Sequence, residues 1–206
     1  MAWDIKTFVV NLQRRPDRLA HIKIELEKVG IWNSYIYPAF DNKILRLRDS
    51  AENTQRLGDA FIGIYLSHLA VIKAAIALGF DEILILEDDV IFPENLKEQW
   101  ANLEMDLPQG WDMFYLIHGA SDNPGMTSYK QFLGNNVYRA GFIGCFGAYL
   151  LSKNGMLKVH AVLNQLVENH IDATLGIYNY HNEDISAYCV SPSIVGIDLG
   201  LGSDNR

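Results

Sequence analysis

The hydrophobic positions at the start of the chain form one continuous run followed by a helical repeat. Residues 5–12 predict a buried strand, because apolar side chains dominate this segment without strict alternation. Pro16 suits the first turn of a helix, and apolar residues then recur at helical spacing until Gly30, which is placed to end that helix. The pattern therefore predicts a strand, a turn and a helix.

A second and longer apolar region follows in the middle of the chain. Residues 58–78 are apolar on nearly every side and are followed by Gly79, so they predict a largely buried helix. The sequence ILIL at residues 83–86 comes soon after it. Four consecutive aliphatic residues indicate a strand that is covered on both faces, as in a parallel sheet between two layers of helices.

The second half of the chain continues this alternation. Ser152 can cap a helix that runs from residue 153 to about residue 167. The other expected elements are a helix at 93–105 and strands at 112–117, 145–152, 185–190 and 194–197. Strands that alternate with helices predict an α/β fold with a mostly parallel central sheet flanked by helices. Ligands of such sheets bind at the carboxyl ends of the strands.

One segment, residues 118–141, departs from the pattern. It is rich in Gly, Asn and Ser, with Tyr129, Phe132 and Tyr138 scattered through it. The composition predicts a long irregular loop of the kind that often carries function.

Composition limits the size and class of the protein. With 206 residues, of which 49% are hydrophobic, the chain suits a single domain over residues 1–206. Its net charge of -8 and its lack of a run of Lys and Arg argue against nucleic-acid binding, although a metal can still bring phosphates to an acidic protein. Cys145 and Cys189 lack CxxC spacing, so buried free thiols are expected rather than a disulfide or a zinc site.

Membrane and export signals are weak. The amino terminus lacks the basic and then apolar pattern of a secretory signal, and no uninterrupted apolar stretch approaches the length of a membrane span. A cytoplasmic location is therefore expected, with at most peripheral contact at the inner face of the membrane.

The strongest chemical signal is an acidic triplet at the end of the ILIL strand. Glu87, Asp88 and Asp89 follow it directly. Ionised carboxylates are costly to bury unless they reach solvent, pair with cations or bind a metal ion. If the strand continues, Glu87 and Asp89 share one side and Asp88 faces the other. Two carboxylates on one side suit Mg²⁺ or Mn²⁺, whose remaining ligands are water and substrate phosphates.

The alternatives to a metal site remain open at this stage. The triplet can be a solvated strand end, or its acids can pair with arginines of a neighbouring loop, namely Arg14, Arg15 and Arg18.

Six segments of the chain occur in the order seen in glycosyltransferase family 25, which includes lipooligosaccharide and procollagen galactosyltransferases. They are VVNLQRRPDRL (9–19), YLSHLAVIKAAI (65–76), LILEDDVIF (84–92), FGAYLLSKNG (146–155), HID (170–172) and GSDNR (202–206). The resemblance implies a GT-A fold and inverting transfer of galactose or another hexose from a nucleotide sugar, UDP-linked, to a glycan or glycoconjugate, as in lipopolysaccharide biosynthesis.

The resemblance also implies roles for the acids. The triplet takes the place of the DxD element that holds a divalent ion, Mn²⁺ or Mg²⁺, on the diphosphate. Asp89 is the first candidate ligand and Glu87 the second, whereas Asp88 is expected to face the donor sugar or the ribose.

The first loop matches the family at Asn11, Arg15 and Arg18, where arginines can contact the ribose and phosphates of the nucleotide. A salt-bridge cluster with Asp17 at the start of the helix is the alternative.

Ser67 and His68 match an SH pair of the family and are further candidates for binding the nucleotide sugar. The apolar surroundings of His68 favour a hydrogen-bonded core histidine instead.

An inverting transferase needs a base that removes the proton of the acceptor hydroxyl. The available carboxylates are Asp172, which matches the HID position, and Glu183 and Asp184. Asp172 can alternatively cap a helix. The aromatic residues of segment 118–141 are expected to form the acceptor side, since their rings suit stacking on sugars.

Two rival functions remain. One is a catalytically silent module that binds a nucleotide, and the other is a metal-dependent nucleotidyltransferase or phosphohydrolase, which also needs clustered carboxylates near phosphates.

Overall fold

The computed structural model of the protein describes residues 4–41, 59–119, 129–165 and 170–203. The helices are α1 (Pro16–Lys28), α3 (Asp59–Leu78), α4 (Leu96–Glu104), α5 (Lys153–Leu163), α6 (Ile171–His181) and a short 3₁₀ helix, η1 (Leu199–Leu201). The strands are β1 (Lys6–Asn11), β2 (Ser34–Pro38), β3 (Glu82–Glu87), β4 (Val90–Ile91), β5 (Met113–Tyr115), β6 (Tyr129–Gly134), β7 (Val137–Ala140), β8 (Ala148–Ser152), β9 (Ala187–Val190) and β10 (Gly196–Ile197).

The main sheet has eight strands in the order β2-β1-β3-β8-β5-β9-β7-β6. Strands β7 and β8 run antiparallel to their neighbours, and the remaining strands share one direction. This arrangement confirms the expected α/β class with a mostly parallel central sheet. A separate two-stranded sheet, β10 with β4, lies over the carboxyl end of β3.

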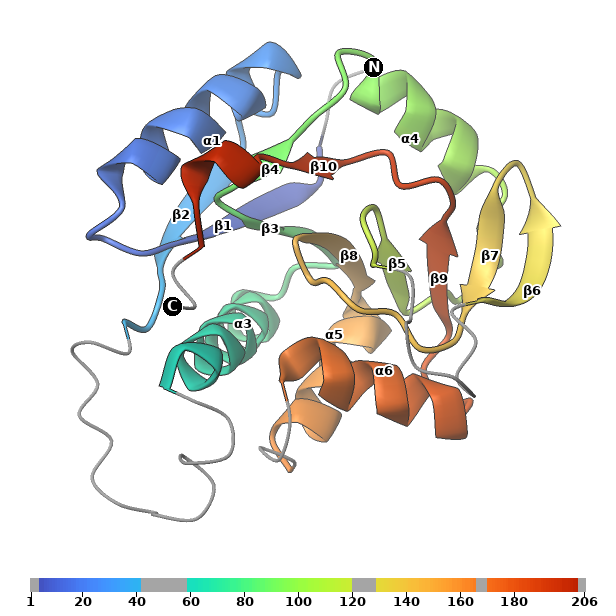
Figure 1. The fold of residues 1–206 in the computed structure, drawn as a ribbon. Coiled ribbons are helices and arrows are strands. Elements are labelled where there is room, and N and C mark those ends of the chain that lie inside the picture. The colour runs from blue at the N-terminus through green and yellow to red at the C-terminus, as the bar shows by residue number, and fades with distance from the viewer. Residues whose placement is uncertain (1–3, 42–58, 120–128, 166–169, 204–206) are drawn as a thin grey trace.

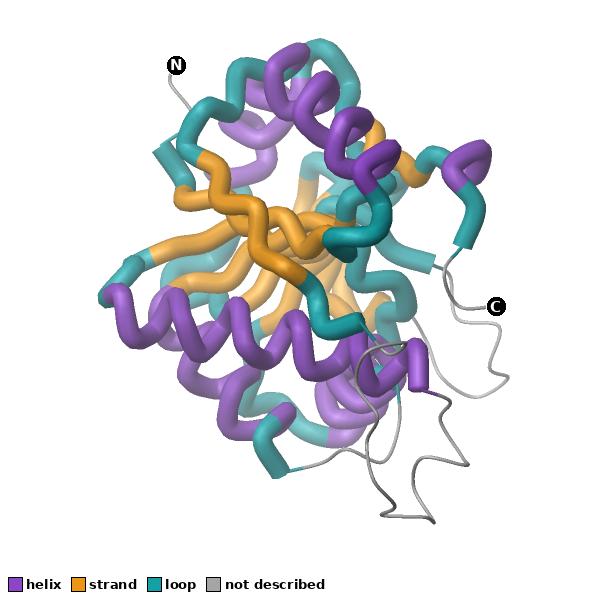
Figure 2. Tube along the Cα trace, turned by 90° about the vertical axis from the view of Figure 1, so that its left-hand side faces the viewer, coloured by secondary structure: helices purple, strands orange, loops and turns teal. Residues whose placement is uncertain are grey.

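Helices cover both faces of the main sheet (Figure 1). Helices α1 and α4 lie on one face, and α3, α5 and α6 lie on the other, so the strands are enclosed between two helical layers, as Figure 2 shows from the side. The ILIL strand explains this division. Leu84 and Leu86 pack in the core with α1 and α4, whereas Ile83 and Ile85 pack in the core with α3 and α5. Each of these fully buried side chains contributes about 1.5–3 kcal/mol, which fixes β3 at the centre of the fold.

Helix α3 packs on β1, α5 and α6. Its window Phe61–Leu78 is long and apolar enough to cross a membrane by length and composition, although Ser67, His68 and Lys73 interrupt its apolar residues. The inner side of the helix, with Tyr65, Val71 and Ile72, lies in the core, and a buried core helix meets the same test.

The prediction of an irregular loop over residues 118–141 is wrong for its second half. Strands β6 and β7 form a hairpin at the edge of the sheet, whereas residues 120–128 lie outside the described part. Asn135 and Asn136 both have positive φ, 40° and 66°, which suits a tight hairpin turn. The hairpin was missed because most of β6 faces solvent and lacks the apolar alternation that predicts a strand.

Two further elements had no clear signal. Strand β2 lies at the other edge of the sheet, with mixed exposure, and α6 begins directly at Ile171. The predicted cap of α5 is confirmed, because Ser152 Oγ accepts a hydrogen bond of 3.1 Å from the Gly155 amide. The helix ends at Leu163, and residues 166–169 lie outside the described part.

Candidate functional site

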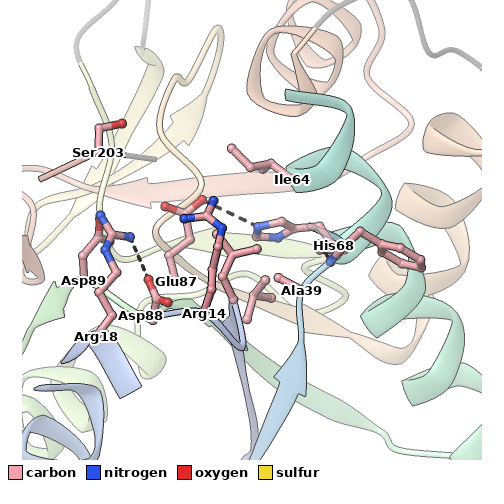
Figure 3. Close-up of a pocket in the computed structure, with 13 residues that line it drawn as sticks. Arg14, Arg18, Ala39, Ile64, His68, Glu87, Asp88, Asp89 and Ser203 are labelled. Carbon is pink, nitrogen blue, oxygen red and sulfur yellow. Dashed lines mark hydrogen bonds and ion pairs between the residues drawn. The ribbon is translucent and has the colours of Figure 1, made fainter. Parts of the chain in front are cut away.

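A pocket opens at the carboxyl ends of β1, β2 and β3. It holds about 670 Å³ of empty space, solvent at its mouth included. Its lining is apolar on one side and charged on the other, and consists of Val10, Leu12, Arg14, Arg18, Ala39, Phe40, Ile64, Ser67, His68, Glu87, Asp88, Asp89 and Ser203. Figure 3 shows the acidic triplet between Arg18 and His68.

Strand pairing brings the first loop to the triplet. Strands β1 and β3 are parallel, with Val10 opposite Glu87. Asn11 therefore lies beside the acids, and its Nδ2 donates a hydrogen bond of 2.7 Å to Asp88 Oδ2.

Asp88 faces inward. Asn11 bonds its Oδ2, Arg18 Nη1 donates to its Oδ1 at 2.8 Å, and only 5% of the residue is exposed. Burial raises the pKa of the Asp88 carboxyl, and the bonds from Asn11 and Arg18 oppose this rise. Both oxygens have protein partners, so the Asp88 carboxylate connects Asn11 of β1 with Arg18 of α1.

Asp89 contacts the same guanidinium, but only one of its two oxygens has a partner among the described residues. Arg18 Nη2 lies 3.1 Å from Asp89 Oδ2, whereas the buried Oδ1 has no hydrogen-bond partner among the described residues. Burial, followed by the charge of Glu87, raises the pKa of Asp89 to about 6. This oxygen is the acceptor that a ligand in the pocket could use.

The strand ends at Glu87, and Asp88 and Asp89 form a turn into β4. The expected alternation, with Asp88 on the opposite side from Asp89, is wrong because both aspartates of this turn contact one arginine. Glu87 is the more open acid, with 30% of its side chain exposed, and its Oε1 lies 3.6 Å from His68 Nε2.

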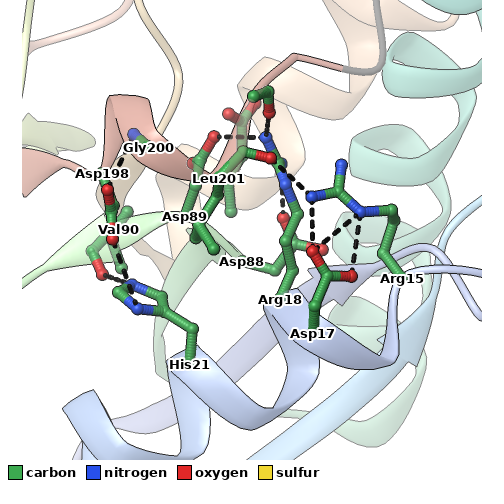
Figure 4. A network of polar contacts seen from close by, with 12 residues as sticks. Arg15, Asp17, Arg18, His21, Asp88, Asp89, Val90, Asp198, Gly200 and Leu201 are labelled. Carbon is green, nitrogen blue, oxygen red and sulfur yellow. Dashed lines mark hydrogen bonds and ion pairs between the residues drawn. The ribbon is translucent and has the colours of Figure 1, made fainter.

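Arginines of α1 and of the loop before it join the acids to the carboxyl-terminal segment (Figure 4). Arg18 also donates to the carbonyl of Gly202, and Arg15 donates to the carbonyl of Leu201 at 2.7 Å. Arg15 pairs with Asp17 at 2.7 Å, and this bond lowers the pKa of Asp17 to about 2. The sequence-based alternative is therefore present in part, because Arg18 pairs with the triplet and Arg15 with Asp17, whereas Arg14 pairs with Asp41 at 2.8 Å.

Ser67 and His68 lie on the side of α3 that meets the pocket, and both are fully buried. Ser67 Oγ donates to the Gly63 carbonyl at 2.6 Å and accepts a bond from the Phe40 amide at 2.8 Å. His68 Nδ1 lies 2.8 Å from the Tyr149 hydroxyl, which fits the hydrogen-bonded core histidine considered above. Its ring nevertheless reaches the pocket wall.

Asp172 lies in the first turn of α6 and close to the triplet. Its Oδ1 accepts a bond from the Ala173 amide at 2.8 Å and its Oδ2 one from the Cys145 amide at 3.3 Å. Burial raises the pKa of the Cys145 thiol to about 11, with further contributions from Glu87, Asp172 and Asp89. The Glu87 amide donates a bond of 2.8 Å to the carbonyl of Gly147, two residues after Cys145, so Asp172 and Glu87 both contact the segment 145–147. A carboxylate in the first helical turn is also stabilised by the helix dipole.

The two other base candidates lie at the opposite end of the same helix. Glu183 and Asp184 follow the last turn of α6, about 15 Å along the helix axis from Asp172. Asp184 Oδ2 accepts a bond of 2.7 Å from the exposed Tyr178 hydroxyl. None of the three base candidates, Asp172 included, is among the residues that line the pocket.

The donor set fits a metal ion only with help from a ligand. Within residues 4–41, 59–119, 129–165 and 170–203, no group of three or more His, Cys, Asp or Glu side chains is arranged to hold a metal ion. The partly exposed Glu87 and the buried, unbonded Oδ1 of Asp89 provide two carboxylates. One or two carboxylates with water and phosphate oxygens are a common Mg²⁺ set, so these residues fit an ion that arrives with a diphosphate.

The apolar side of the pocket was not expected from the sequence. Ala39 and Phe40 follow β2, and Ile64 comes from α3. Nothing in the local pattern separates these residues from ordinary core positions, because their common role depends on how β2 and α3 meet.

The layered sheet with an acidic pocket at its strand ends is an α/β fold that can be compared with solved structures. Among solved structures, the chain is similar to a glycosyltransferase involved in the glycosylation of the major capsid of PBCV-1, with a TM-score of 0.50 and 13% identity. The match covers 91% of this chain and 82% of that chain, and at this identity it concerns the fold alone.

The sequence decides the family. The sequence model of glycosyltransferase family 25 (LPS biosynthesis protein) matches residues 4–175, and the chain belongs to this family. It is 28% identical over 125 residues to a glycosyltransferase 25 family member of Aedes aegypti. It is also 27% identical over 127 residues to the inactive glycosyltransferase 25 family member 3 of Homo sapiens. These matches cover 52% and 54% of this chain, but only 20% and 21% of the two relatives.

Proposed function

We propose that the protein transfers a hexosyl group, such as galactose, from a UDP-linked sugar to a hydroxyl of a glycan or glycoconjugate, with inversion at the anomeric carbon. Membership of glycosyltransferase family 25 supports the class of reaction. The observation that carries the proposal is the carboxylate oxygen Oδ1 of Asp89, which is buried beside Glu87 at the pocket lining and has no hydrogen-bond partner among the described residues.

The donor fits the pocket by its chemistry. The apolar side, with Phe40 and Ile64, suits the base of a nucleotide, and Arg14 lines the same pocket as a cationic group for phosphates. Glu87 and Asp89 would hold a Mn²⁺ or Mg²⁺ ion that arrives with the diphosphate. When bound, such an ion neutralises the leaving diphosphate.

The acceptor hydroxyl then needs a base outside the metal ligands. As the hydroxyl oxygen bonds to the anomeric carbon, Asp172 accepts its proton, and the bond from that carbon to the diphosphate breaks, with its electron pair leaving on the nucleotide. Attack opposite the leaving group inverts the centre. Asp172 is favoured over Glu183 and Asp184 because it bonds the Cys145 amide, two residues before Gly147, whose carbonyl accepts a bond from the Glu87 amide.

A catalytically silent binding module is the second candidate. The ion pairs of Arg18 with Asp88 and Asp89 favour it, since they satisfy part of the triplet without any ligand. Such a module would bind a nucleotide but release none from a nucleotide sugar.

The proposal is tested by incubating the protein with Mn²⁺ and a panel of nucleotide sugars, and measuring the free nucleotide that is released. Release from a UDP-hexose, absent with EDTA and in Asp89→Asn, is expected. Binding without release would favour the silent module, and full activity of Asp89→Asn in EDTA would refute the metal site.

The base is tested in the same assay with an acceptor present. Asp172→Asn is expected to lower transfer by about 10²–10⁴-fold, the usual contribution of general base catalysis. Glu183→Gln is the matched control on the same helix and should leave the rate within about 2-fold of the wild type. If Glu183→Gln lowered the transfer rate and Asp172→Asn did not, the general base would be Glu183, at the far end of α6.

A further inference from the structure

His68 is fully buried, and one of its two ring nitrogens lacks a hydrogen-bond partner among the described residues. The residue is 0% exposed, and the nitrogen in question is Nε2. A buried polar atom without a partner costs about 1–3 kcal/mol. Such atoms in native proteins call for an explanation, and one is a partner that is completed only in the functional state.

The other ring nitrogen is held firmly. Tyr149, on β8, is fully buried, and its hydroxyl lies 2.8 Å from His68 Nδ1. The two rings are also stacked, with centroids 5.8 Å apart. No other acceptor for this hydroxyl is found in the described part of the chain, so the hydroxyl is satisfied only if it donates to Nδ1.

This hydrogen bond decides where the imidazole carries its proton. If Nδ1 accepts from Tyr149, a neutral ring has its proton on Nε2. The Nε2–H group then faces the pocket, where Glu87 Oε1 lies 3.6 Å away. That distance is beyond a hydrogen bond by about 0.5 Å, a gap that a rotation of the open Glu87 side chain can close.

We propose that His68, oriented by Tyr149, is a positioning residue that donates a hydrogen bond from Nε2 to Glu87 and directs the second oxygen of that carboxylate toward a divalent cation on the donor diphosphate. The inference rests on the proposed function for its ligand. Groups that orient a metal-binding side chain in this way commonly change metal affinity by about 10- to 100-fold when they are removed.

The geometry is tested without any turnover. Nitrogen NMR of the histidine-labelled protein at neutral pH should show the Nε2–H tautomer for His68, and its Nε2 resonance should move in Glu87→Gln. An Nδ1–H tautomer or an imidazolium would overturn the inference. An Nε2 chemical shift of His68 that is the same in the wild type and in Glu87→Gln would also overturn it.

The consequence is tested by the Mn²⁺ dependence of nucleotide release and by calorimetry of Mn²⁺ binding with UDP. His68→Leu should raise the half-saturating Mn²⁺ concentration about 10- to 100-fold, with a smaller change in the rate at saturation. His68→Gln, which keeps an N–H donor near the Nε2 position, should recover most of this loss. A purely structural role would lower the saturated rate and the stability without shifting the Mn²⁺ dependence.

Tyr149 has a matched control in the neighbouring strand. Tyr149→Phe should weaken Mn²⁺ binding in part, because the imidazole loses its orienting partner. Tyr115→Phe removes another fully buried hydroxyl, on β5, and should leave Mn²⁺ binding unchanged. Equal effects of the two changes would overturn the inference. A wild type that releases no nucleotide would refute the proposed function, whereas the NMR result would still decide the role of His68.

Discussion

At the scale of single residues, the acidic turn depends on one guanidinium. Arg18 has 11% of its side chain exposed, and it contacts Asp88, Asp89 and the carbonyl of Gly202. From the sequence, this arginine is predicted either to contact the nucleotide or to belong to a salt-bridge cluster. Its position makes it the internal cation that allows two carboxylates to be buried together.

Arg18→Ala is therefore expected to lower stability strongly. Removal of one partner from a buried ion pair costs about 3–5 kcal/mol, which corresponds to a fall in Tm on the order of 10 °C. Thermal unfolding of Arg18→Ala and of the double variant with Asp88→Asn measures this effect, and the double variant should recover part of the loss.

The matched control is Lys153→Ala, which breaks the exposed pair with Asp81 and should cost at most about 1 kcal/mol. If Arg18→Ala were as stable as this control but failed to bind UDP, the arginine would be a nucleotide contact rather than a structural cation.

At the scale of elements, the β6–β7 hairpin changes the expected place of the acceptor. Tyr138 lies four strands from β3 in the sheet order, about 19 Å away at the usual strand spacing. Its ring packs against Tyr129 and Phe132, with centroids 4.8 and 5.1 Å away. A single sugar ring at the triplet would not reach this cluster, so we expect the cluster to cover the edge of the sheet rather than to contact the reacting sugar.

Tyr138→Ala should accordingly reduce stability by about 1.5–3 kcal/mol, since it removes a packed aromatic ring. The rates of transfer to the acceptor and of donor hydrolysis should fall by the same factor, and this factor should equal the loss of folded protein. The two rates measured below the melting transition test this directly. Loss of transfer with unchanged or faster hydrolysis would restore the hairpin as the acceptor side.

The start of α5 depends on a local cap. Ser152→Ala removes the acceptor for the Gly155 amide and should cost about 1 kcal/mol, or roughly 2–4 °C in Tm. Thermal unfolding measures the change. Ser152→Thr keeps a capping hydroxyl and should lose less, and an equal loss in both variants would show that packing, rather than the cap, decides the effect.

At the scale of the whole molecule, the two ends of β3 each carry a glutamate, and the two glutamates have different surroundings. Glu87 ends the strand at the pocket, whereas Glu82 begins it with an Oε1 that is buried without a partner among the described residues. Burial, and then the charge of Glu104, raises the pKa of Glu82 to about 7. The folded state therefore binds this proton more tightly than the unfolded state, whose pKa is near the ordinary value of 4.5.

Stability should consequently fall as the pH rises through the interval from about 4.5 to 7, and the loss from this group should level off above it. The effect is on the order of 1–3 kcal/mol, reduced by the partial access of the side chain to water. Denaturant unfolding between pH 5 and 8 should show a smaller decline for Glu82→Gln. Glu27→Gln, at an exposed position on α1, is the control and should follow the wild type. An unchanged decline in Glu82→Gln would show that other groups cause it.

The sequence by itself determined the features that depend on neighbouring residues. The apolar run before Glu87 places the acids at a strand end because four aliphatic residues can be buried only inside the sheet. Ser152 caps α5 because its hydroxyl reaches an amide three residues away. The ordered motifs also identified the family, since they match it without any knowledge of contacts.

Only the tertiary structure decided which distant residues meet. Asp88 forms hydrogen bonds with Arg18 and Asn11, which are 70 and 77 residues away in the sequence, and His68 forms one with Tyr149, 81 residues away. Strand order also brought Asp172 close to the triplet, left Glu183 at the far end of α6 and carried the hairpin to the sheet edge. Local patterns follow from backbone periodicity, but these partnerships follow from the packing of strands and helices, which no short stretch of sequence encodes.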